Sequence, residues 1–413
     1  MSNLVKHYRN DMKNIPQLTN NWGSMIKLLD KVLVEGFNFV PVLSITKSST
    51  EAITATISLG AGHGFIDRQV VRIGGSTNGW DGDFKVLSAN TNDIVIECLS
   101  SHPQAISGSA ICSTAPLDFE IVFSTPIDST EPKRAYRSTD PESLGLILLV
   151  HDFCVSGAAA TGAKFAKIGV VSSMSDIDNI TGVQMPFDAQ NPNANWGWDG
   201  THHGWAKWYY AVAHTNYDNG FSADSAAVPY IGGPFTIAGT GESGFVLSIN
   251  IGLQNWVETW GAYGFVEFYD SSLKSKNALL MCAGIPNRYA QSTDHAILAR
   301  GAIVPFGTGD SVGSSAGQLK GLIWYKSNGV ANSEGLVRPP YLDLQSANHI
   351  ISDMLIIDSS GVTRGVVPFL KTTTLATTTS KIDADFGKIA NYASSWNSSI
   401  ATSTRYCLTL ESK

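Results

Sequence analysis

Short runs of alternating apolar and polar residues follow one another along most of the chain beyond residue 36. Gly-, Ser- and Asn-rich turns separate these runs, a pattern typical of half-buried β-strands. Helical patterns do not intervene between them, which favours antiparallel sheets over a parallel α/β sheet. We therefore expect a mainly β protein, with a small β-barrel or sandwich over residues 37–116 and a larger antiparallel β-sandwich of two packed sheets over residues 117–413.

The strand candidates are short and bounded by turn residues. In the smaller part they are NFVPVLSITKSSTEAITATISLG, RQVVRIGG, DFKVLSANTNDIVIECL and GSAICST. In the larger part they are FEIVFS, LGLILLVHDF, FAKIGVV, WAKWYYAVAH, GFVLSINIGL, YGFVEFYD, ALLMCAG, RGAIVPF, QLKGLIWY, DMLIIDSSG and RYCLTLES. Pro116 and its polar neighbours mark the predicted boundary between the two parts.

One segment has the spacing of an amphipathic helix. Within residues 21–36 the apolar side chains recur at intervals of three and four positions. Asn21 precedes this pattern as the predicted N-cap, and Gly36 follows it as the predicted C′ glycine. The apolar side of the predicted helix consists of Trp22, Met25, Ile26, Leu29, Val32 and Leu33.

This helix and the polar residues before it form a predicted N-terminal arm over residues 1–36. Two interpretations are open: the helix packs on its own domain, or it docks the chain on a neighbouring protein. Residues 1–20 are too polar to bury much by themselves, so in the second interpretation they become ordered only across that neighbour. A second, short helix is predicted near residues 381–396 from the spacing of its apolar residues.

Composition and charge exclude several classes of function. The net charge is −7 and no basic run occurs, which argues against nucleic-acid binding. The longest apolar run, LGLILLV at 144–150, is far shorter than the roughly 20 residues of a membrane helix. The N-terminus lacks the apolar stretch of a secretion signal, so we expect synthesis in a cytoplasm.

The five cysteines are widely spaced, which favours free buried thiols over disulfides or a zinc site.

The segment NANWGWDGTHHGWAKWYY, residues 193–210, is the strongest candidate for a binding surface. Six of the ten tryptophans lie between residues 196 and 260, and indole rings both stack on sugars and anchor protein interfaces. Strand alternation places Trp208 and Tyr210 on one face and Tyr209 on the other. Core packing, a subunit interface and glycan binding are all open as roles. The candidate residues are Trp196, Trp198, Trp205, Trp208, Tyr209, Trp256 and Trp260.

Patterns for catalysis and metal binding are weak. His202 and His203 are adjacent, and neighbours on a strand point to opposite faces, so they do not readily share one metal ion. Neither a nucleophile elbow nor a P-loop occurs. Glu258, between Trp256 and Trp260 on one predicted face, is either an interface carboxylate or the acid of a glycan-cleaving enzyme. We assign no catalytic residue, metal or cofactor, and expect a non-enzymatic protein.

The motif GHGF has an explanation in local backbone geometry. Gly60, Gly62 and Gly64 permit the left-handed conformations of a tight connection. Phe65 can then plug the end of the small predicted barrel. His63, between two glycines, is expected to make hydrogen bonds within the turn and not to serve as a ligand or base.

Four blocks of this sequence, in this order, resemble a group of uncharacterised virion proteins of tailed bacteriophages. The blocks are NWGSMIKLLDKVLVEGF, GHGFIDRQVVRIGG, WDGDFKVLSANTNDIVI and AYRSTDPESLGLILLVHD. In that group a short N-terminal helix precedes a small β domain, and a larger β domain begins around the stretch that contains AYRSTD. The resemblance covers roughly residues 20–152 well and the rest of the chain only in style.

The resemblance implies a structural component of a virion, most often in the tail or baseplate, and it supplies no catalytic residues. It implies that the protein is made in the host cytoplasm, resides in the virion and contacts other virion proteins. A symmetric homo-oligomer is expected, because virion parts are built from rings. The alternative is a host-receptor or glycan-binding virion protein, with a host-surface glycan as its ligand. Neither a nucleic-acid partner nor a membrane span is expected.

Overall fold

The chain is mainly β, as predicted. The computed structural model describes residues 4–126, 128–153, 164–185, 207–211, 234–252, 259–270, 274–284, 302–305, 318–321, 351–357, 363–373, 381–384, 387–392 and 405–410. Within these ranges every strand pair is antiparallel. One helical region, near the N-terminus, accompanies the sheets in the described part of the chain.

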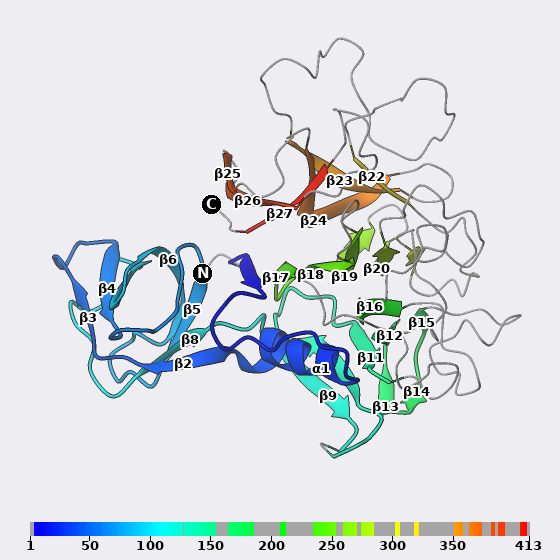
Figure 1. Ribbon diagram of the computed structural model, residues 1–413, viewed down its shortest axis with the longest axis horizontal. Coiled ribbons are helices and arrows are strands. Elements are labelled where there is room, and N and C mark those ends of the chain that lie inside the picture. The colour runs from blue at the N-terminus through cyan, green and yellow to red at the C-terminus, as the bar shows by residue number, and fades with distance from the viewer. Residues whose placement is uncertain are drawn as a thin grey trace, which may run out of the picture.

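A seven-stranded sheet forms one end of the molecule, which we call the small β unit, residues 37–116 (Figure 1). Its strands in spatial order are β2 (Phe37–Pro41), β8 (Ile111–Thr114), β5 (Val70–Gly74), β6 (Gly82–Ala89), β7 (Asp93–Glu97), β4 (Thr54–Ser58) and β3 (Ser44–Lys47). The sheet curls around a core of its own that includes Ile73, Trp80 and Phe84. Its edge strands β2 and β3 do not pair with each other, so the predicted barrel does not close.

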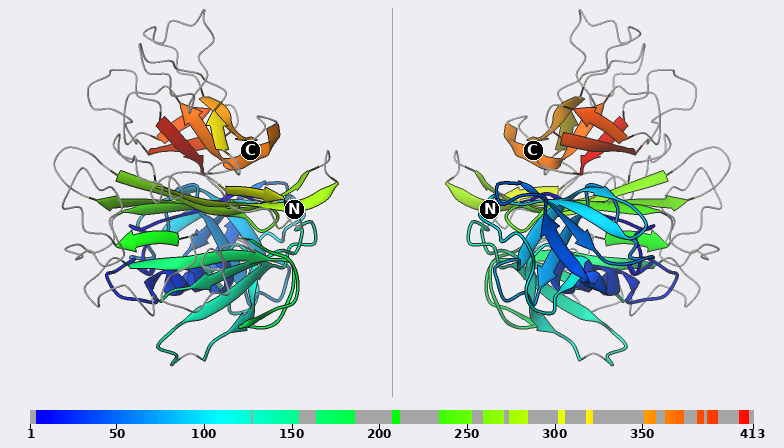
Figure 2. Two further views of the ribbon diagram at one scale, coloured as in Figure 1. Left: turned by 90° about the vertical axis from the view of Figure 1, so that its right-hand side faces the viewer. Right: turned by 90° about the vertical axis from the view of Figure 1, so that its left-hand side faces the viewer.

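Three stacked sheets form the body of the molecule (Figures 1 and 2). The lower sheet has the order β15 (Gln184–Met185), β12 (Lys164–Val171), β11 (Ile147–His151), β10 (Lys133–Ser138) and β9 (Phe119–Ser124), and β16 (Lys207–Ala211) also pairs with β12. The central sheet has the order β1 (Lys6–Arg9), β17 (Phe235–Thr240), β18 (Gly244–Gly252), β19 (Thr259–Asp270), β20 (Ser275–Gly284) and β21 (Ala302–Pro305). The upper sheet has the order β22 (Gln318–Gly321), β23 (Ile351–Ile357), β24 (Thr363–Thr373), β27 (Arg405–Thr409), β26 (Gly387–Tyr392) and β25 (Lys381–Ala384).

The central sheet is covered on both faces, which corrects the predicted sandwich of two sheets. Phe235 and Ile237 of β17 belong to the main core, together with Ile168 of the lower sheet. Ala238 lies on the opposite face of β17 and is also fully buried. On the side of the upper sheet, β24 contacts β18 and β19. The hairpin β13 (Met174–Asp176) and β14 (Asn179–Ile180) packs against the outer face of the lower sheet.

The predicted helix is present but starts later than expected. Helix α1 spans Ser24–Leu29 and continues as a wider helical turn over Asp30–Glu35. Asn21 is not its N-cap, because Gly23 takes that position in a left-handed conformation and provides no side chain. A carboxylate oxygen of Asp152 accepts the amides of Met25 and Ile26 instead, at 2.8 and 3.2 Å. At the other end Gly36 has the predicted positive φ, 74°.

The apolar side of the helix faces the interior of the same chain. The side chains of Met25, Ile26, Leu29, Val32 and Leu33 are at most 3% exposed and belong to the main core of the body. Trp22 is half-buried, and its ring packs against Phe153 and Phe165. These side chains are therefore not the docking surface of the second interpretation, and the helix packs on its own chain.

The polar residues before the helix are also ordered on their own chain, which corrects the expectation that they bury little. Strand β1 pairs with β17 at the edge of the central sheet. Apolar side chains spaced along this segment reach the main core; they are Tyr8, Met12, Ile15 and Leu18. The alternating pattern gave no sign of β1, because its sequence, KHYR, is polar and the strand depends on an edge formed by residues far along the chain.

The predicted short helix near residues 381–396 is wrong. Strands β25 and β26 occupy Lys381–Ala384 and Gly387–Tyr392 and form a hairpin in which Ile382 pairs with Ile389. Four apolar residues at near-helical spacing were thus insufficient to distinguish a helix from two short strands. The strand candidates inferred from alternation coincide with strands, whereas β10, β17, β24 and the short strands β13, β14 and β15 were not predicted. The six residues of β17 are all buried, so this strand lacks the alternation that reveals a one-sided strand.

Candidate assembly surface and the junction beside it

Of the aromatic residues predicted to form a binding surface, Trp208 is part of the core. Its side chain is fully buried, and its ring lies 5.9 Å from that of Phe245 and 6.1 Å from that of Tyr263. Tyr210 is buried in the same cluster, so the predicted sharing of one face by Trp208 and Tyr210 is confirmed. Core packing is therefore the role of this face of β16.

The other aromatic candidates stay predictions. Tyr209 and Trp260 occupy positions in β16 and β19, but their side chains lie outside the described residues. Four further candidates lie outside the described residues altogether; they are Trp196, Trp198, Trp205 and Trp256. His202, His203 and Glu258 also fall there. The interface and glycan hypotheses for this set rest on the sequence alone.

Asp152 is the most strongly perturbed carboxyl group in the described part of the body. It is fully buried, accepts the first amides of the helix, and receives a 2.7 Å hydrogen bond from the hydroxyl of Tyr210. Burial raises the pKa of Asp152 to about 6, although the hydrogen bonds from Tyr210 and Ile26 act to lower it. The carboxylate joins the helix, β11 and β16, which is a structural role.

Glu267 and Asp30 serve similar structural purposes. Glu267 accepts hydrogen bonds of 2.8 Å from the Ser143 hydroxyl and from the amides of Leu144 and Leu146, so it fixes the loop before β11. Asp30 accepts a 2.7 Å hydrogen bond from the hydroxyl of Tyr136 and is paired with Arg134. Burial raises the pKa of both carboxyl groups. Their oxygens are engaged in hydrogen bonds and an ion pair within the protein.

His63 is a turn residue, as predicted. Its Nδ1 accepts the amide of Phe65 at 3.0 Å, so its Nε2 carries the proton and donates to the carbonyl of Asn90 at 2.9 Å. Gly62 and Gly64 have φ values of 80° and 74°, and Phe65 is buried in the core of the small β unit. No group of three or more His, Cys, Asp or Glu side chains in the described ranges could hold a metal ion.

Exposed apolar side chains are concentrated on the small β unit. Nine large apolar side chains are exposed among the described residues, and six of them lie within residues 37–116, which contain fewer than half of those residues. The six are Phe39, Leu43, Ile53, Leu87, Leu99 and Ile111. This concentration, and not the predicted aromatic segment, is the feature that the described structure offers to a partner.

Three of these side chains and a proline lie on or beside the edge strand β2, and we call them the outer apolar surface: Phe39 and Pro41 in β2, Leu43 just after it, and Ile111 in the neighbouring β8. Pro41 of β2 pairs directly with Ile111 of β8, so the two side chains share a face. Phe39, two positions before Pro41, points the same way. The exposed fractions of Phe39, Leu43 and Ile111 are 58%, 68% and 48%.

A backbone irregularity turns Phe39 outward. Asn38 has a positive φ of 56°, and the register between β2 and β8 shifts between Phe37 and Val40. As a result Phe37 is buried and Phe39 is exposed, although regular alternation would place both on one face. The sequence carried a weak signal for this shift, because Asn tolerates the left-handed conformation better than most residues.

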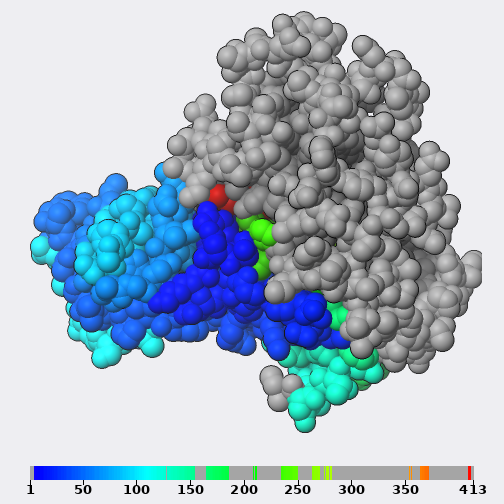
Figure 3. All heavy atoms as spheres, viewed as in Figure 1, coloured from blue at the N-terminus to red at the C-terminus, as the bar shows by residue number. Residues whose placement is uncertain are grey.

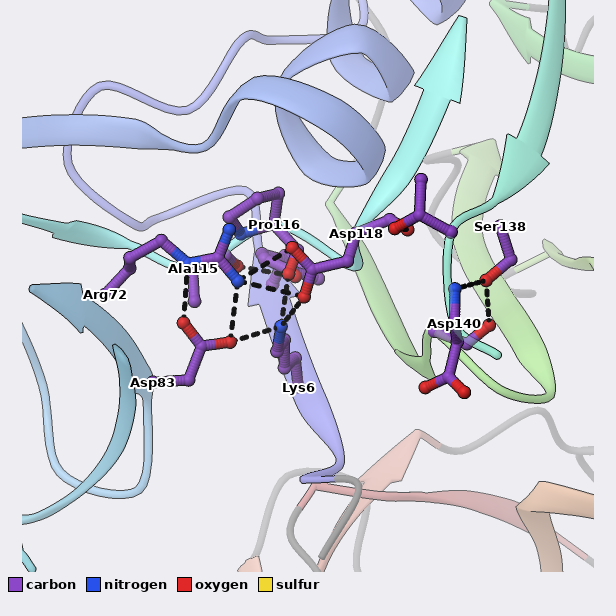
Figure 4. A network of polar contacts seen from close by, with 11 residues as sticks. Lys6, Arg72, Asp83, Ala115, Pro116, Asp118, Ser138 and Asp140 are labelled. Carbon is purple, nitrogen blue, oxygen red and sulfur yellow. Dashed lines mark hydrogen bonds and ion pairs between the residues drawn. The ribbon is translucent and has the colours of Figure 1, made fainter. Parts of the chain in front are cut away.

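A network of four charged groups joins the small β unit to the body (Figure 4). Lys6 of β1, itself buried, contacts Asp83 at 2.6 Å and Asp118 at 2.9 Å. Arg72 of β5 contacts the same two carboxylates, at 2.6 and 2.7 Å. Lys6 also donates to the carbonyl of Pro116. Two cations and two anions from the arm, the small β unit and the following linker thus neutralise one another.

The charges of this network are mutually stabilised. Burial acts to raise the pKa of Asp83, but the hydrogen bond from Arg72 and the positive charge of Lys6 outweigh it and hold the pKa below its usual value. The hydrogen bond to Asp83 raises the pKa of Arg72. Beside the network, the hydroxyl of Tyr8 donates to the carbonyl of Ala115 at 2.7 Å, and burial raises the pKa of Tyr8 well above its usual value.

Comparison with known proteins leaves the family open. No protein-family model matches the chain, and no curated protein matches it significantly. In the described part of the chain, no helix is both long and apolar enough to cross a membrane.

Proposed function

We propose that this chain is a non-enzymatic structural subunit of a tailed-phage virion, in the tail or baseplate, and that the outer apolar surface contacts a neighbouring virion subunit. The observation that carries the proposal is the concentration of exposed apolar side chains on the small β unit. Exposed apolar side chains that lie together are typical of protein contact sites, because their burial removes apolar area from water.

The chemistry of the described residues supports the non-enzymatic part of the proposal. The perturbed carboxyl groups Asp152, Glu267 and Asp30 are engaged in hydrogen bonds that fix a helix start, a loop and a strand. The two-part β organisation also fits the sequence resemblance to tailed-phage virion proteins, in which a helix precedes a small and then a larger β domain. The location in the tail or baseplate rests on that resemblance.

The test is incorporation into particles of the virus that encodes the chain. A virus lacking the gene is complemented with a tagged copy, and particles are purified on a density gradient. We expect the wild-type chain to band with the particles. The double substitution Phe39→Ser and Leu43→Ser is expected to reduce incorporation at least about tenfold, because an apolar contact of two large side chains contributes roughly 3 kcal/mol or more.

Ile53→Ser and Leu99→Ser form the matched control, since these side chains are exposed on the same unit but outside the outer apolar surface. The control chain is expected to be incorporated normally. A wild-type chain found only in the soluble fraction would refute the virion assignment. Normal incorporation of the Phe39/Leu43 variant would leave that assignment standing but refute the role of the outer apolar surface.

A further inference from the structure

The small β unit is joined to the body by two chain crossings that lie side by side, which is the geometry of a hinge. Phe37, where the chain enters the unit, pairs with Thr114, where it leaves. Past the exit, the amide of Leu117 donates to the carbonyl of Val32 at 2.9 Å. We propose that residues 37–116 form an orientable module, which the N-terminal arm holds in one orientation and which turns about these crossings when the arm releases it.

Backbone conformation at the crossings suits such a hinge. Gly36 has a φ of 74°, and a Cβ at this position would lie 2.6 Å from the carbonyl oxygen of Thr114. The two crossings are therefore in direct backbone contact. Asp118, just beyond the second crossing, also has a positive φ of 62°. Rotation about a pair of adjacent crossings needs dihedral changes at only a few residues, as in other hinge motions.

The two hydrophobic cores share no residue, so turning the module disturbs the core of the body only where Phe37 and Ile66 contact it. The core of the small β unit is formed by buried side chains from the sequence range Ile45 to Cys112. Two side chains of the small β unit contact the core of the body: Phe37 is part of that core, and Ile66 packs against it. Phe37 belongs to the hinge itself, where its ring lies 6.1 Å from that of Tyr8 on the arm. Little apolar area outside the hinge therefore opposes a rotation.

Outside the hinge, the contacts that hold the module in its orientation are polar, and the arm supplies most of them. Lys6 binds Asp83 of the module. Further along the arm, the Lys13 ammonium donates to a carbonyl in the glycine-rich loop, and the Asn14 amide donates to Asn38 at 3.2 Å. Figure 3 shows the arm as a dark-blue band between the module and the rest of the molecule.

Polar links of this kind can be exchanged for water more readily than apolar contacts. The side chains of Arg72 and Asp118, which pair across the junction, are 35% and 39% exposed. Water and salt ions therefore reach the network, and exposed ion pairs of this kind contribute little net stability. Lys6 differs from these exposed side chains, because it is buried and contacts the carboxylates of both Asp83 and Asp118. Its loss is expected to release the arm from the module.

The experiment compares the full-length wild-type chain with Lys6→Met, which removes the charge but retains the apolar stem. Hydrogen–deuterium exchange is followed by mass spectrometry, and small-angle X-ray scattering reports the overall dimensions. In Lys6→Met we expect the backbone amides within residues 36–38 and 114–118 to exchange at least about tenfold faster, because the carboxylates of Asp83 and Asp118 then share only Arg72 and the arm no longer binds the module at this point. Strands β5 and β7 should exchange as in the wild type, and the radius of gyration should increase. Lys27→Met, at an exposed helix position, is the matched control and should change neither quantity.

Two results would overturn the proposal. Unchanged junction exchange and an unchanged radius of gyration in Lys6→Met would show that the module is fixed by other contacts. Faster exchange throughout residues 37–116 would show that the unit unfolds and does not turn. If Lys6→Met does not fold, Arg72→Met is measured in the same way, because it removes the other cation of the network from the module side. An increase in the radius of gyration of this variant supports the proposal, and an unchanged value refutes it.

Discussion

Asp152 shows how a single side chain can replace a local helix cap. The helix begins after Gly23, which has no side chain to accept the first amides, and Asp152 accepts them from more than 100 residues away in sequence. Because Asp152 also binds the hydroxyl of Tyr210, one buried carboxylate fixes the helix against two strands of the lower sheet. The cost is that a fully buried group is held in a charged state at neutral pH.

This arrangement predicts a dependence of stability on pH. The pKa of Asp152 is raised to about 6 in the folded protein from an ordinary value of 3.8, so the folded state binds the proton more tightly. The contribution of this group to stability is therefore complete below pH 3.8 and is lost as the pH rises through about 6. The loss has an upper limit of about 3 kcal/mol. Urea unfolding of the wild type and of Asp152→Asn across this range should give curves that diverge as the pH rises.

The comparison with Asp152→Asn matters because other carboxyl groups titrate in the same range, and their contributions cancel in the difference. Asn retains a carbonyl oxygen that can accept the helix amides, so the variant is expected to fold. Parallel stability curves for the two proteins between pH 4 and 6 would show that Asp152 has no raised pKa in the folded state.

At the scale of elements, the N-terminal arm is the clearest case of tertiary contacts giving structure to a polar sequence. Strand β1 completes the edge of the central sheet, and the apolar side chains after it enter the main core. The arm also contacts the small β unit through Lys6 and Lys13. It is therefore part of the folded body, in contrast to a segment that becomes ordered only on a neighbour.

Removal of the arm should destabilise the whole chain. Deletion of residues 1–20 would expose the edge of β17 and the core contacts of Tyr8 and Leu18. We expect a fall of several degrees or more in the melting temperature, and aggregation through the exposed edge, visible by size-exclusion chromatography. Deletion of residues 1–5 leaves β1 in place and is the control. A deletion variant lacking residues 1–20 that stays monomeric, with an unchanged melting temperature, would contradict this role.

At the scale of the whole molecule, the chain consists of a three-sheet body and a small β unit with separate hydrophobic cores. The ionic network and the paired crossings connect them, so each core can unfold on its own. Two cores joined mainly by polar contacts typically unfold as two cooperative units. The orientation of the small β unit then depends on contacts that do not determine the stability of either core.

Calorimetry should resolve two thermal transitions. Ile73→Ala, in the core of the small β unit, is expected to lower one of them, and Leu247→Ala, in the body, the other. Each substitution should cost about 2–5 kcal/mol, because both side chains are essentially fully buried. Leu43→Ala, at an exposed position, should affect neither transition. A single transition that both core substitutions shift equally would show one cooperative unit.

The sequence by itself determined the fold class, most strand positions and several local details. Alternation and turn residues act over a few positions, so they identify strands without reference to the rest of the chain. For the same reason three local details were predictable. They are the left-handed glycines around His63, the hydrogen bonds of that histidine within its turn, and the shared face of Trp208 and Tyr210. What alternation could not reveal is a strand such as β17, which is buried on both faces.

Only the tertiary structure decided which segments meet. The polar arm became a strand because β17, more than 200 residues away, offers an edge for hydrogen bonding. The helix faces inward because its apolar side meets two sheets formed much later in the chain. Phe39 is exposed because a shift at Asn38 changes the register against β8. Lys6 and Asp118 pair only after the chain has folded back on itself, and such contacts depend on the whole chain, since no local pattern encodes them.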